Sequence, residues 1–242
     1  MVFSPERLDR FARHIVLPQV GGAGQFALAE AHVALVGLGG IGSPALQYLA
    51  GAGIGHLTLI DDGKVETSNL QRQTIYSERD VGHGKAVSAR RWLANFDHKL
   101  EVSLHDRRIE KDNAAGAIAG ADLVLDGTDN FATRYLVNDA CVLLGKPYVW
   151  GSIYRFDGQA SVFWAEHGPC YRCLYPEPPP PDVPATDTAA PATDPMTPPP
   201  GQTPMGMALG QEQPSLARRR PATRARRQRA IGNPLLPVLQ PG

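Results

Sequence analysis

A segment that reads as strand, glycine turn and helix constrains the fold of this chain more than any other feature. His32–Val36 is a short aliphatic and β-branched run of the kind that is buried in parallel sheets. Three glycines follow it directly in the spacing G-x-G-x-x-G, at Gly37, Gly39 and Gly42. Pro44 then falls in the first turn of a helix, where its missing N–H has no partner to lose. The pattern is typical of a βαβ unit that binds a nucleotide at the glycine turn.

The continuation of this segment supplies the second half of the unit. The helix ends at Gly51–Gly53, His56–Ile60 forms the second strand, and Asp61 lies at its carboxyl end. Glycines let the backbone approach phosphates, a helix N-terminus offers free N–H groups, and an acid after the second strand can hold a ribose. A glycine turn that only connects a strand to a helix is the simpler alternative. We predict a nucleotide site formed by Gly37, Gly39, Gly40, Gly42 and Asp61.

The rest of the chain up to about residue 175 alternates between strands and helices, which favours an α/β fold. Further strands are predicted at Leu100–Leu104, within Asp122–Asn130 and at Pro147–Trp150, and helices at Asp112–Ala119, at Phe131–Leu144, from Ser4-Pro5 and from near Lys85. The first helix places Leu8, Phe11 and Ile15 on one face. Tyr154–Trp164 reads as a hairpin that turns at Asp157-Gly158. We therefore expect a Rossmann-like, doubly wound, mostly parallel sheet with a C-terminal antiparallel hairpin.

Polar and charged side chains follow these strands at the sheet edge where such folds bind ligands. Asn69 and Arg72 lie in the loop after the second strand. Lys85 opens a helix, where its charge opposes the helix dipole, so an anionic partner becomes a reasonable alternative to a solvent-exposed role. Asp126 and Asp129 lie near the carboxyl end of the fourth strand, although Asp129 could equally cap the next helix.

Two of the three cysteines form a Cys-x-x-Cys motif at Cys170 and Cys173. Such a pair is half of a tetrahedral zinc site, and a closed site needs two further ligands. Cys141 lies in an apolar helical segment and reads as a small buried hydrophobe. The residues alone leave a half-built zinc site, a redox pair and unpaired thiols open.

Composition divides the chain near residue 175. The 24 basic residues balance 24 acidic ones, which argues against a protein held on nucleic acid by its overall charge. A secretion signal and an apolar run of about 18 residues are both missing, so we expect a cytoplasmic protein without a membrane span. All aromatic residues lie at or before Tyr175, and 17 of the 22 prolines follow it. Residues 179–242, rich in Pro, Ala and Arg, are expected to be a disordered tail.

Seven motifs in a fixed order resemble those of the MoeB/ThiF/HesA adenylyltransferases, which are bacterial relatives of the ubiquitin-activating enzymes. The motifs are Arg10–Ile15, the Gly37–Gly42 turn, Leu59–Asp61, Asn69–Gln73, Val81–Lys85, Asp126–Asn130 and Cys170–Leu174. Each motif alone is weak evidence for this family, whereas the whole set in this order is specific to it. Because the resemblance runs from about Leu8 to Pro176, residues 1–178 are expected to form an ATP-binding domain that is truncated at its C-terminal side.

The resemblance implies a reaction between ATP and a ubiquitin-like sulfur-carrier protein of molybdopterin, thiamine or cysteine synthesis. The carrier's C-terminal Gly-Gly carboxylate would attack the α-phosphate, giving an acyl-adenylate and pyrophosphate. Asp61 would bind the ribose and Asn69 would contact the nucleotide. Arg72 and Lys85 would neutralise the phosphates, and Asp129 would hold Mg²⁺.

The resemblance also implies a homodimer and a structural zinc ion. Arg13 matches an arginine that reaches the ATP of the other subunit. In relatives, a second Cys-x-x-Cys completes a four-thiolate zinc site with the pair that matches Cys170 and Cys173. This chain has no second pair, so its Zn²⁺ site is expected to be incomplete.

The sequence departs from the family after Pro181. The arginine run at 218–227 could contact nucleic acid or an acidic surface, but it is short and lacks interleaved aromatic residues, so nucleic-acid binding is not favoured. A GC-rich gene read out of frame near codon 182 would produce the same mixture of residues, and we favour this interpretation. An inactive truncated remnant of the enzyme is therefore one alternative function.

A Rossmann oxidoreductase is the other alternative, since Gly37–Gly42 and Asp61 also satisfy the NAD fingerprint. Asn69–Gln73, Lys85 and Thr128–Asn130 favour ATP, because hydride transfer needs no cation at the α-phosphate. Comparing ATP–pyrophosphate exchange with NAD binding distinguishes the two enzyme classes.

Overall fold

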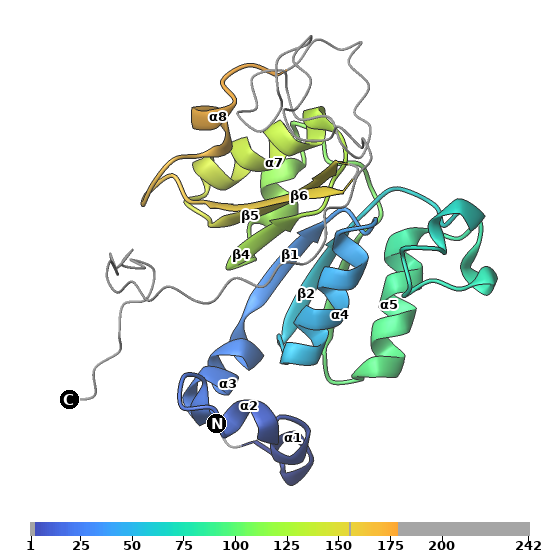
Figure 1. The fold of residues 1–242 in the computed structure, drawn as a ribbon, viewed down its shortest axis with the longest axis vertical. Helices are drawn as coiled ribbons and strands as arrows, with labels where there is room; N and C mark the ends of the chain where they lie inside the picture. Colours follow the sequence, from blue (N-terminus) through green and yellow to red (C-terminus); the bar gives the residue numbers. More distant parts are fainter. Residues whose placement is uncertain (1–2, 155, 179–242) are drawn as a thin grey trace, which may run out of the picture. The chain divides into compact units, whose positions relative to one another are not determined.

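Six strands form one sheet in the computed structural model, which describes residues 3–154 and 156–178. The strands are β1 (His32–Val36), β2 (His56–Ile60), β3 (Glu101–His105), β4 (Leu123–Asp126), β5 (Tyr148–Tyr154) and β6 (Asp157–Phe163). Their order across the sheet is β3-β2-β1-β4-β5-β6, and all neighbours are parallel except β5 and β6 (Figure 1). This is the strand order of doubly wound nucleotide-binding folds, so the predicted fold class is confirmed.

Helices cover both faces of the sheet. They are α1 (Pro5–Arg10), α2 (Ala12–Ile15), α3 (Gly21–Glu30), α4 (Gly42–Ala52), α5 (Lys85–Phe96), α6 (Ala114–Ile118), α7 (Phe131–Leu143) and α8 (Tyr171–Leu174). Val33 and Leu35 of β1 join the core formed with α4 and α5. Ala34 and Val36 join the core formed with α6, α7 and α8, because successive side chains of a strand point to opposite faces. β1 is therefore buried on both faces, as its apolar sequence predicts.

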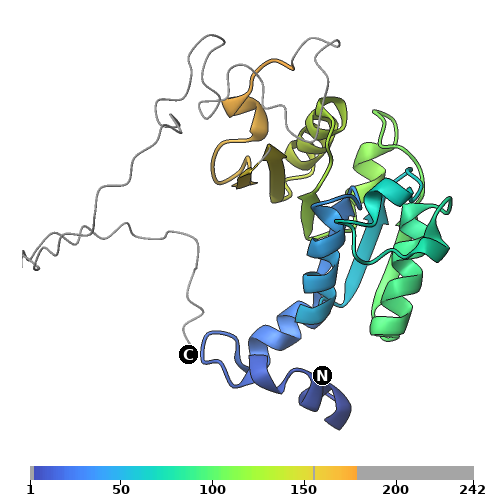
Figure 2. The ribbon, with the colours of Figure 1, turned by 45° about the vertical axis from the view of Figure 1, so that its right-hand side comes forward.

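The N-terminal helices lie at the amino end of β1, where Figure 2 shows them gathered together. Ser4 caps α1 as predicted, its hydroxyl accepting a hydrogen bond from the N–H of Arg7 at 3.3 Å. Arg7 forms an ion pair with Asp97, just after α5, and this pair ties α1 to the rest of the fold. Phe11 is buried, but the helix breaks there into α1 and α2 and leaves Leu8 46% exposed. The single apolar stripe predicted for the first helix is thus interrupted.

The sequence does not predict α3. Three of its first four residues are glycines, which disfavour helix, and its apolar residues form no stripe along one face. Gln25 of α3 is nevertheless fully buried, and its side-chain amide donates to the carbonyl of Ala52 at 2.8 Å. Tertiary contacts with α4 therefore stabilise a helix that local propensity does not favour.

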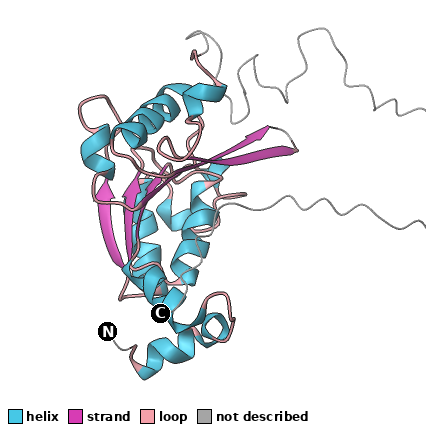
Figure 3. Cartoon of the chain, turned by 90° about the vertical axis from the view of Figure 1, so that its left-hand side faces the viewer, coloured by secondary structure: helices cyan, strands magenta, loops and turns pink. Residues whose placement is uncertain are grey.

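The hairpin turn lies two residues earlier than predicted. Tyr154 pairs with Asp157, so Asp157 and Gly158 belong to β6 and the turn precedes them. β5 pairs with β4 only up to Trp150, and beyond that point β5 and β6 continue as a two-stranded ribbon (Figure 3). Tyr148 and Trp150 bury their rings in the core. That packing fixes the strand register and overrides the local turn preference of Asp-Gly.

No helix among residues 3–154 and 156–178 is long and apolar enough to cross a membrane. The segment 179–242, for which the sequence predicts disorder, lies outside the described residues.

Candidate functional site

The carboxyl ends of β1, β2 and β4 meet where the strand order changes direction. β1 has β2 on one side and β4 on the other, an arrangement that opens a crevice at this edge of a doubly wound sheet. Two cavities lie there, a small cavity of about 250 Å³ and a large cavity of about 490 Å³. The residues that line both are Gly39, Gly63, Lys85, Gly127, Thr128 and Asp129. The two cavities therefore share one wall.

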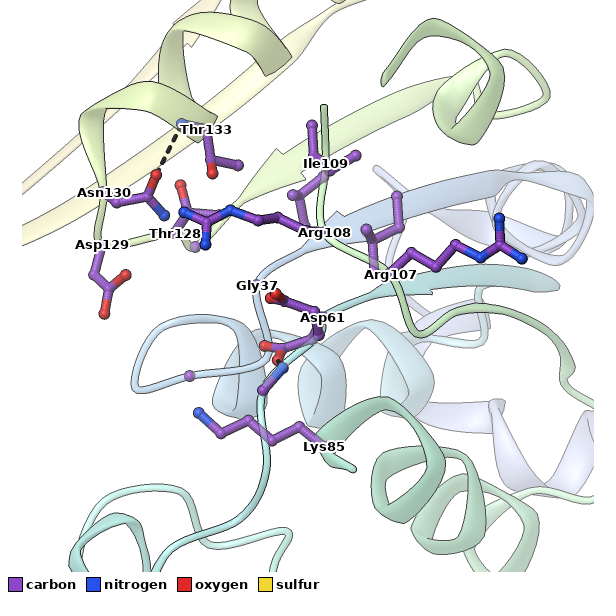
Figure 4. Close-up of a pocket in the computed structure, with 16 residues that line it drawn as sticks. Gly37, Asp61, Lys85, Arg107, Arg108, Ile109, Thr128, Asp129, Asn130 and Thr133 are labelled. Carbon is purple, nitrogen blue, oxygen red and sulfur yellow. Dashed lines mark hydrogen bonds between the residues drawn. The ribbon is translucent and has the colours of Figure 1, made fainter. Parts of the chain in front are cut away.

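Asp61 lines the small cavity from the end of β2 (Figure 4). Its Oδ2 accepts a hydrogen bond from the N–H of Leu38 at 2.6 Å, and its Oδ1 accepts one from the N–H of Gly63 at 2.8 Å. These bonds fix the carboxylate against the glycine turn, and each oxygen keeps a lone pair for a further donor. Ile60 and Ile109 form an apolar part of the wall of the small cavity. A fixed acid beside apolar side chains suits a ligand with hydroxyl groups and a flat ring.

Two glycines shape the turn and two face the cavities. Gly37 has a φ of +83°, and a Cβ at Gly42 would lie 1.8 Å from the carbonyl oxygen of Gly37. Neither position tolerates a side chain without backbone movement. Gly39 and Gly40 line the cavities, and a Cβ on either would meet no heavy atom closer than 3.4 Å. The turn itself requires Gly37 and Gly42, whereas Gly39 and Gly40 leave room for a ligand.

Asn69 and Arg72 line the large cavity from the loop after β2. Asn69 is buried, and its Oδ1 accepts a hydrogen bond from the N–H of Glu66 at 3.1 Å, which closes a short 3₁₀ turn. Arg72 is exposed and donates from Nη1 to the carbonyl of Ser68 at 3.1 Å. Asn69 thus has a structural bond in addition to its predicted role, and Arg72 presents a positive charge at the cavity wall.

Lys85 is the first residue of α5 and lines both cavities. Its backbone N–H donates to the carbonyl of Gly63 at 2.9 Å, and the N–H of Val65 donates to the carbonyl of His83 at 2.9 Å. These two bonds hold the start of the helix beside the loop that follows Asp61. Because a cation at a helix N-terminus costs stability, the position suits a residue that meets an anion.

Asn130, and not Asp129, caps α7. Its Oδ1 accepts a hydrogen bond from the N–H of Thr133 at 2.8 Å. The capping alternative for Asp129 is therefore wrong, because the helix begins one residue further along than that role requires. Asp129 is exposed and faces both cavities, so its carboxylate fits a hard cation such as Mg²⁺ together with phosphate oxygens.

Asp126 is fully buried at the end of β4. It accepts hydrogen bonds from the hydroxyl of Tyr148 at 2.6 Å and from the N–H of Thr128 at 2.8 Å. Burial raises the pKa of this carboxyl, although hydrogen bonds from the side chain and N–H of Thr128 and from Tyr148, together with the charge of Arg134, oppose the shift. Asp126 lines neither of the two cavities, so it shapes the turn at Thr128.

Arg13 lies outside both cavities. It is an exposed residue of α2, at the amino end of β1. The structure does not bring it to the site of its own chain, and its role at the site of a second subunit stays a prediction.

Sequence reasoning missed four residues of the site. Arg107, Arg108 and Ile109 follow β3 and line the small cavity, and in Figure 4 Arg108 and Arg107 point in opposite directions. The available signal was position, since β3 ends at the same sheet edge as β1 and β2. Arg134 of α7 lines the large cavity and is only 4% exposed. Its signal was an arginine in the first turn of α7, directly after the polar segment Thr128–Asn130.

Cys170 and Cys173 lie with their sulfurs 3.7 Å apart at the start of α8. Two sulfurs of a tetrahedral zinc site with Zn–S bonds of about 2.3 Å lie about 3.8 Å apart. Burial opposes ionisation of Cys170, but hydrogen bonds from Cys173 and from the N–H of Arg172 outweigh it and lower its pKa. Burial raises the pKa of Cys141 to about 12. The described part of the chain holds no group of three or more potential metal ligands, so the pair fits one edge of a zinc site and no more.

The sequence matches the ThiF family over residues 11–205. It is 53% identical over 184 residues to the probable adenylyltransferase/sulfurtransferase MoeZ of Mycobacterium tuberculosis, covering 74% of this chain and 47% of that protein. It is 50% identical over 186 residues to the sulfur carrier protein adenylyltransferase of Thermus thermophilus, covering 75% and 69% of the two chains. This chain therefore spans about half the length of MoeZ and about two thirds of the Thermus protein.

A solved structure supports the same assignment. The E. coli tRNA N6-threonylcarbamoyladenosine dehydratase TcdA, in complex with ATP, superposes with a TM-score of 0.61 and 29% sequence identity, over 65% of each chain. The family match covers most of this chain, and the seven ordered motifs lie within or beside it. The chain belongs to the ThiF family.

Proposed function

We propose that this protein uses ATP to adenylate the C-terminal Gly-Gly carboxylate of a ubiquitin-like sulfur-carrier protein, releasing pyrophosphate. The observation that carries the proposal is the pair of cavities that share Lys85 and Asp129. A nucleoside in the small cavity and an acyl group entering through the large one would bring the reacting atoms together at that shared wall. The names of the relatives from M. tuberculosis and T. thermophilus, both adenylyltransferases, support the same reaction.

The chemical step would need charge stabilisation more than a protein nucleophile. A carboxylate oxygen attacks the α-phosphorus, the bond to the oxygen that bridges the α- and β-phosphates breaks, and pyrophosphate leaves. Negative charge increases on the leaving oxygen and spreads over the phosphoryl oxygens. Arg72 and Lys85 line the large cavity, where their charges would meet it. Catalysis would then come from positioning and electrostatics.

The other predicted residues would bind the nucleotide. Asp61 would accept hydrogen bonds from the ribose hydroxyls, and Gly39 and Gly40 would let the phosphates approach the backbone. Asn69 would contact the nucleotide from the large cavity. Asp129 would hold Mg²⁺, an ion that neutralises phosphate charge in such reactions.

We also propose a domain organisation and an assembly. Residues 1–178 would be the ATP-binding domain and 179–242 a separate tail. Arg13 would complete the ATP site of a second subunit in a homodimer, because its own chain leaves it exposed and outside both cavities.

Carrier-dependent exchange of radiolabelled pyrophosphate into ATP tests the proposed reaction. We expect exchange that requires both the carrier's free C-terminal carboxylate and Mg²⁺. NAD binding without exchange would indicate an oxidoreductase instead. A folded protein that binds no nucleotide would indicate an inactive remnant.

Replacing Asp61 with alanine should weaken ATP binding by roughly 1.5–3 kcal/mol, the value of hydrogen bonds to a charged group. Calorimetric titration with ATP measures the effect. The Asp112→Ala variant is the control, since Asp112 is exposed and lines neither of the two cavities. An unchanged ATP affinity in a folded Asp61→Ala protein would rule out the ribose-binding role.

The 242-residue protein should bind zinc weakly and in less than stoichiometric amounts. Cys170 and Cys173 supply two thiolates, whereas a closed structural site needs four ligands. Metal analysis of protein purified by gel filtration measures the content, and Cys170→Ser should abolish whatever zinc is bound. Cys141→Ala is the control, because Cys141 is buried in α7. One tightly bound zinc ion per chain would contradict this expectation.

A further inference from the structure

Two hydrogen bonds fix the backbone of Leu38, which lies in the glycine turn between β1 and α4. The N–H of Leu38 donates to Oδ2 of Asp61 at 2.6 Å, and its carbonyl accepts a hydrogen bond from the hydroxyl of Tyr76 at 3.0 Å. Leu38 and Tyr76 are both buried. Asp61, which lies against this turn in Figure 4, belongs to the predicted nucleotide site, whereas the proposed reaction gives no role to Tyr76.

Tyr76 approaches the turn from the interior of the protein. Its side chain packs in the core formed with α4 and α5, and it lines neither of the two cavities. Burial raises the pKa of the hydroxyl, and the charges of Asp61 and Asp80 raise it further, so the hydroxyl keeps its proton. Because a carbonyl oxygen can only accept, Tyr76 is the donor of the bond to Leu38.

This hydrogen bond determines where the next N–H group points. The carbonyl of Leu38 and the N–H of Gly39 belong to one planar trans peptide, so they point in opposite directions. With the carbonyl held toward Tyr76, the N–H of Gly39 faces the cavities that Gly39 lines. In the described part of the chain, the N–H groups of Gly39, Gly40 and Ile41 donate no hydrogen bond. A row of such donors before a helix suits an anion.

The same hydrogen bond holds the loop after β2 against the glycine turn. The N–H of Tyr76 donates to the carbonyl of Gln73 at 3.1 Å, one residue after Arg72. The side chain of Arg72 lies beside Gly40, where an added Cβ would be 3.4 Å from its Nε. Tyr76 therefore ties together two parts of the large cavity wall, the backbone donors of the turn and the loop that carries a cation.

We propose that Tyr76 is a positioning residue for phosphate binding, because its hydroxyl holds the Leu38–Gly39 peptide with the N–H directed at a phosphate group of the nucleotide. The inference rests on the proposed function and adds a residue that does not touch the substrate. A peptide that is oriented before the nucleotide arrives does not have to be ordered on binding, and this strengthens the complex. Loss of the hydroxyl should therefore affect ligands that carry phosphates and spare a ligand that carries none.

The test compares two ligands and three proteins. The ligands are ATP with Mg²⁺ and adenosine, which has the same nucleoside without a phosphate. The proteins are the unchanged chain, Tyr76→Phe and the matched control Tyr48→Phe, whose tyrosine is 79% exposed on α4 and lines neither cavity. Calorimetric titration gives the Kd of ATP directly, and titrations repeated in adenosine give the Kd of adenosine by competition. Circular dichroism and urea unfolding establish that each protein is folded.

Tyr76→Phe should raise the Kd of ATP roughly 3- to 10-fold, the value of one neutral hydrogen bond, and leave the Kd of adenosine within about twofold. Tyr48→Phe should change neither constant. A merely structural role would weaken both ligands by the same factor. That result, or an unchanged ATP affinity in folded Tyr76→Phe, would overturn the inference.

A second measurement uses the unchanged protein and so does not depend on how the variant folds. Glycine labelled with nitrogen-15 gives an amide resonance for Gly39, which is identified by its absence from Gly39→Ala. This resonance should shift when ATP binds and move much less with adenosine, whereas equal shifts would contradict the direction assigned to the N–H. The proposed function is tested separately, because ATP binding without carrier-dependent pyrophosphate exchange would contradict adenylation and not the role of Tyr76.

Discussion

Replacing Lys85 with alanine should lower the rate of carrier adenylation roughly 100- to 1,000-fold while changing the KM for ATP far less. The reason is that Lys85 lines both cavities, at the wall where negative charge would develop as the α-phosphorus is attacked. An interaction made mainly in the transition state affects kcat more than substrate binding. Steady-state pyrophosphate exchange over a range of ATP concentrations separates the two parameters. Arg72→Ala and Asp129→Ala should behave in the same direction.

Lys111→Ala is the matched control for this experiment, because Lys111 is an exposed lysine that lines neither of the two cavities. It should leave both kinetic parameters unchanged. If Lys85→Ala raised only the KM for ATP, Lys85 would be a ground-state binding residue and its assigned role would be wrong.

Replacing Gly42 with alanine should destabilise the protein by more than about 4 kcal/mol, or prevent folding altogether. A Cβ at this position would lie 1.8 Å from the carbonyl oxygen of Gly37, which is a backbone atom of the same turn. The overlap cannot be relieved by a side-chain rotation, so the turn itself must move. Urea unfolding followed by circular dichroism measures the loss of stability.

Two other glycines provide the comparison. Gly51→Ala, in the same helix as Gly42, meets no heavy atom within 4 Å and should stabilise α4 by about 0.5–1 kcal/mol. Gly39→Ala should leave stability nearly unchanged and weaken ATP binding, because its Cβ would project into the space where the cavities meet. Equal stability of the Gly42→Ala and Gly51→Ala proteins would contradict the structural role of the turn.

The parts of the fold with strong local signals could be predicted from sequence. β1 and β2 have the predicted bounds, because each is an apolar run that ends at a residue with a fixed role, Gly37 or Asp61. β3 is shifted by one residue, and α7 ends one residue earlier than predicted. These differences fall at the ends of helices and strands, where the backbone hydrogen-bond pattern, and not the side chain, determines which residue is the last one.

The remaining features depend on contacts that local sequence does not contain. The register of β5 is set by the burial of Trp150, and α3 is stabilised by packing of Gln25. The site shows the same division. The motifs located Asp61 and Lys85, but local sequence cannot distinguish Asp129 from Asn130 as the cap of α7, since either side chain can perform that role.

The strand order also determines the order in which the strands can assemble during folding. The hydrogen bond from His32 to Thr58 joins residues 26 positions apart, whereas the bond from His32 to Asp122 joins residues 90 positions apart. Closing the longer loop costs more chain entropy, so β1, β2 and β3 can assemble before β4 inserts beside β1. The crevice exists only after that insertion. A nucleotide that bridges the crevice would therefore bind only the fully assembled sheet, and would stabilise it. Nucleotide affinity therefore reports whether the two halves of the sheet have joined.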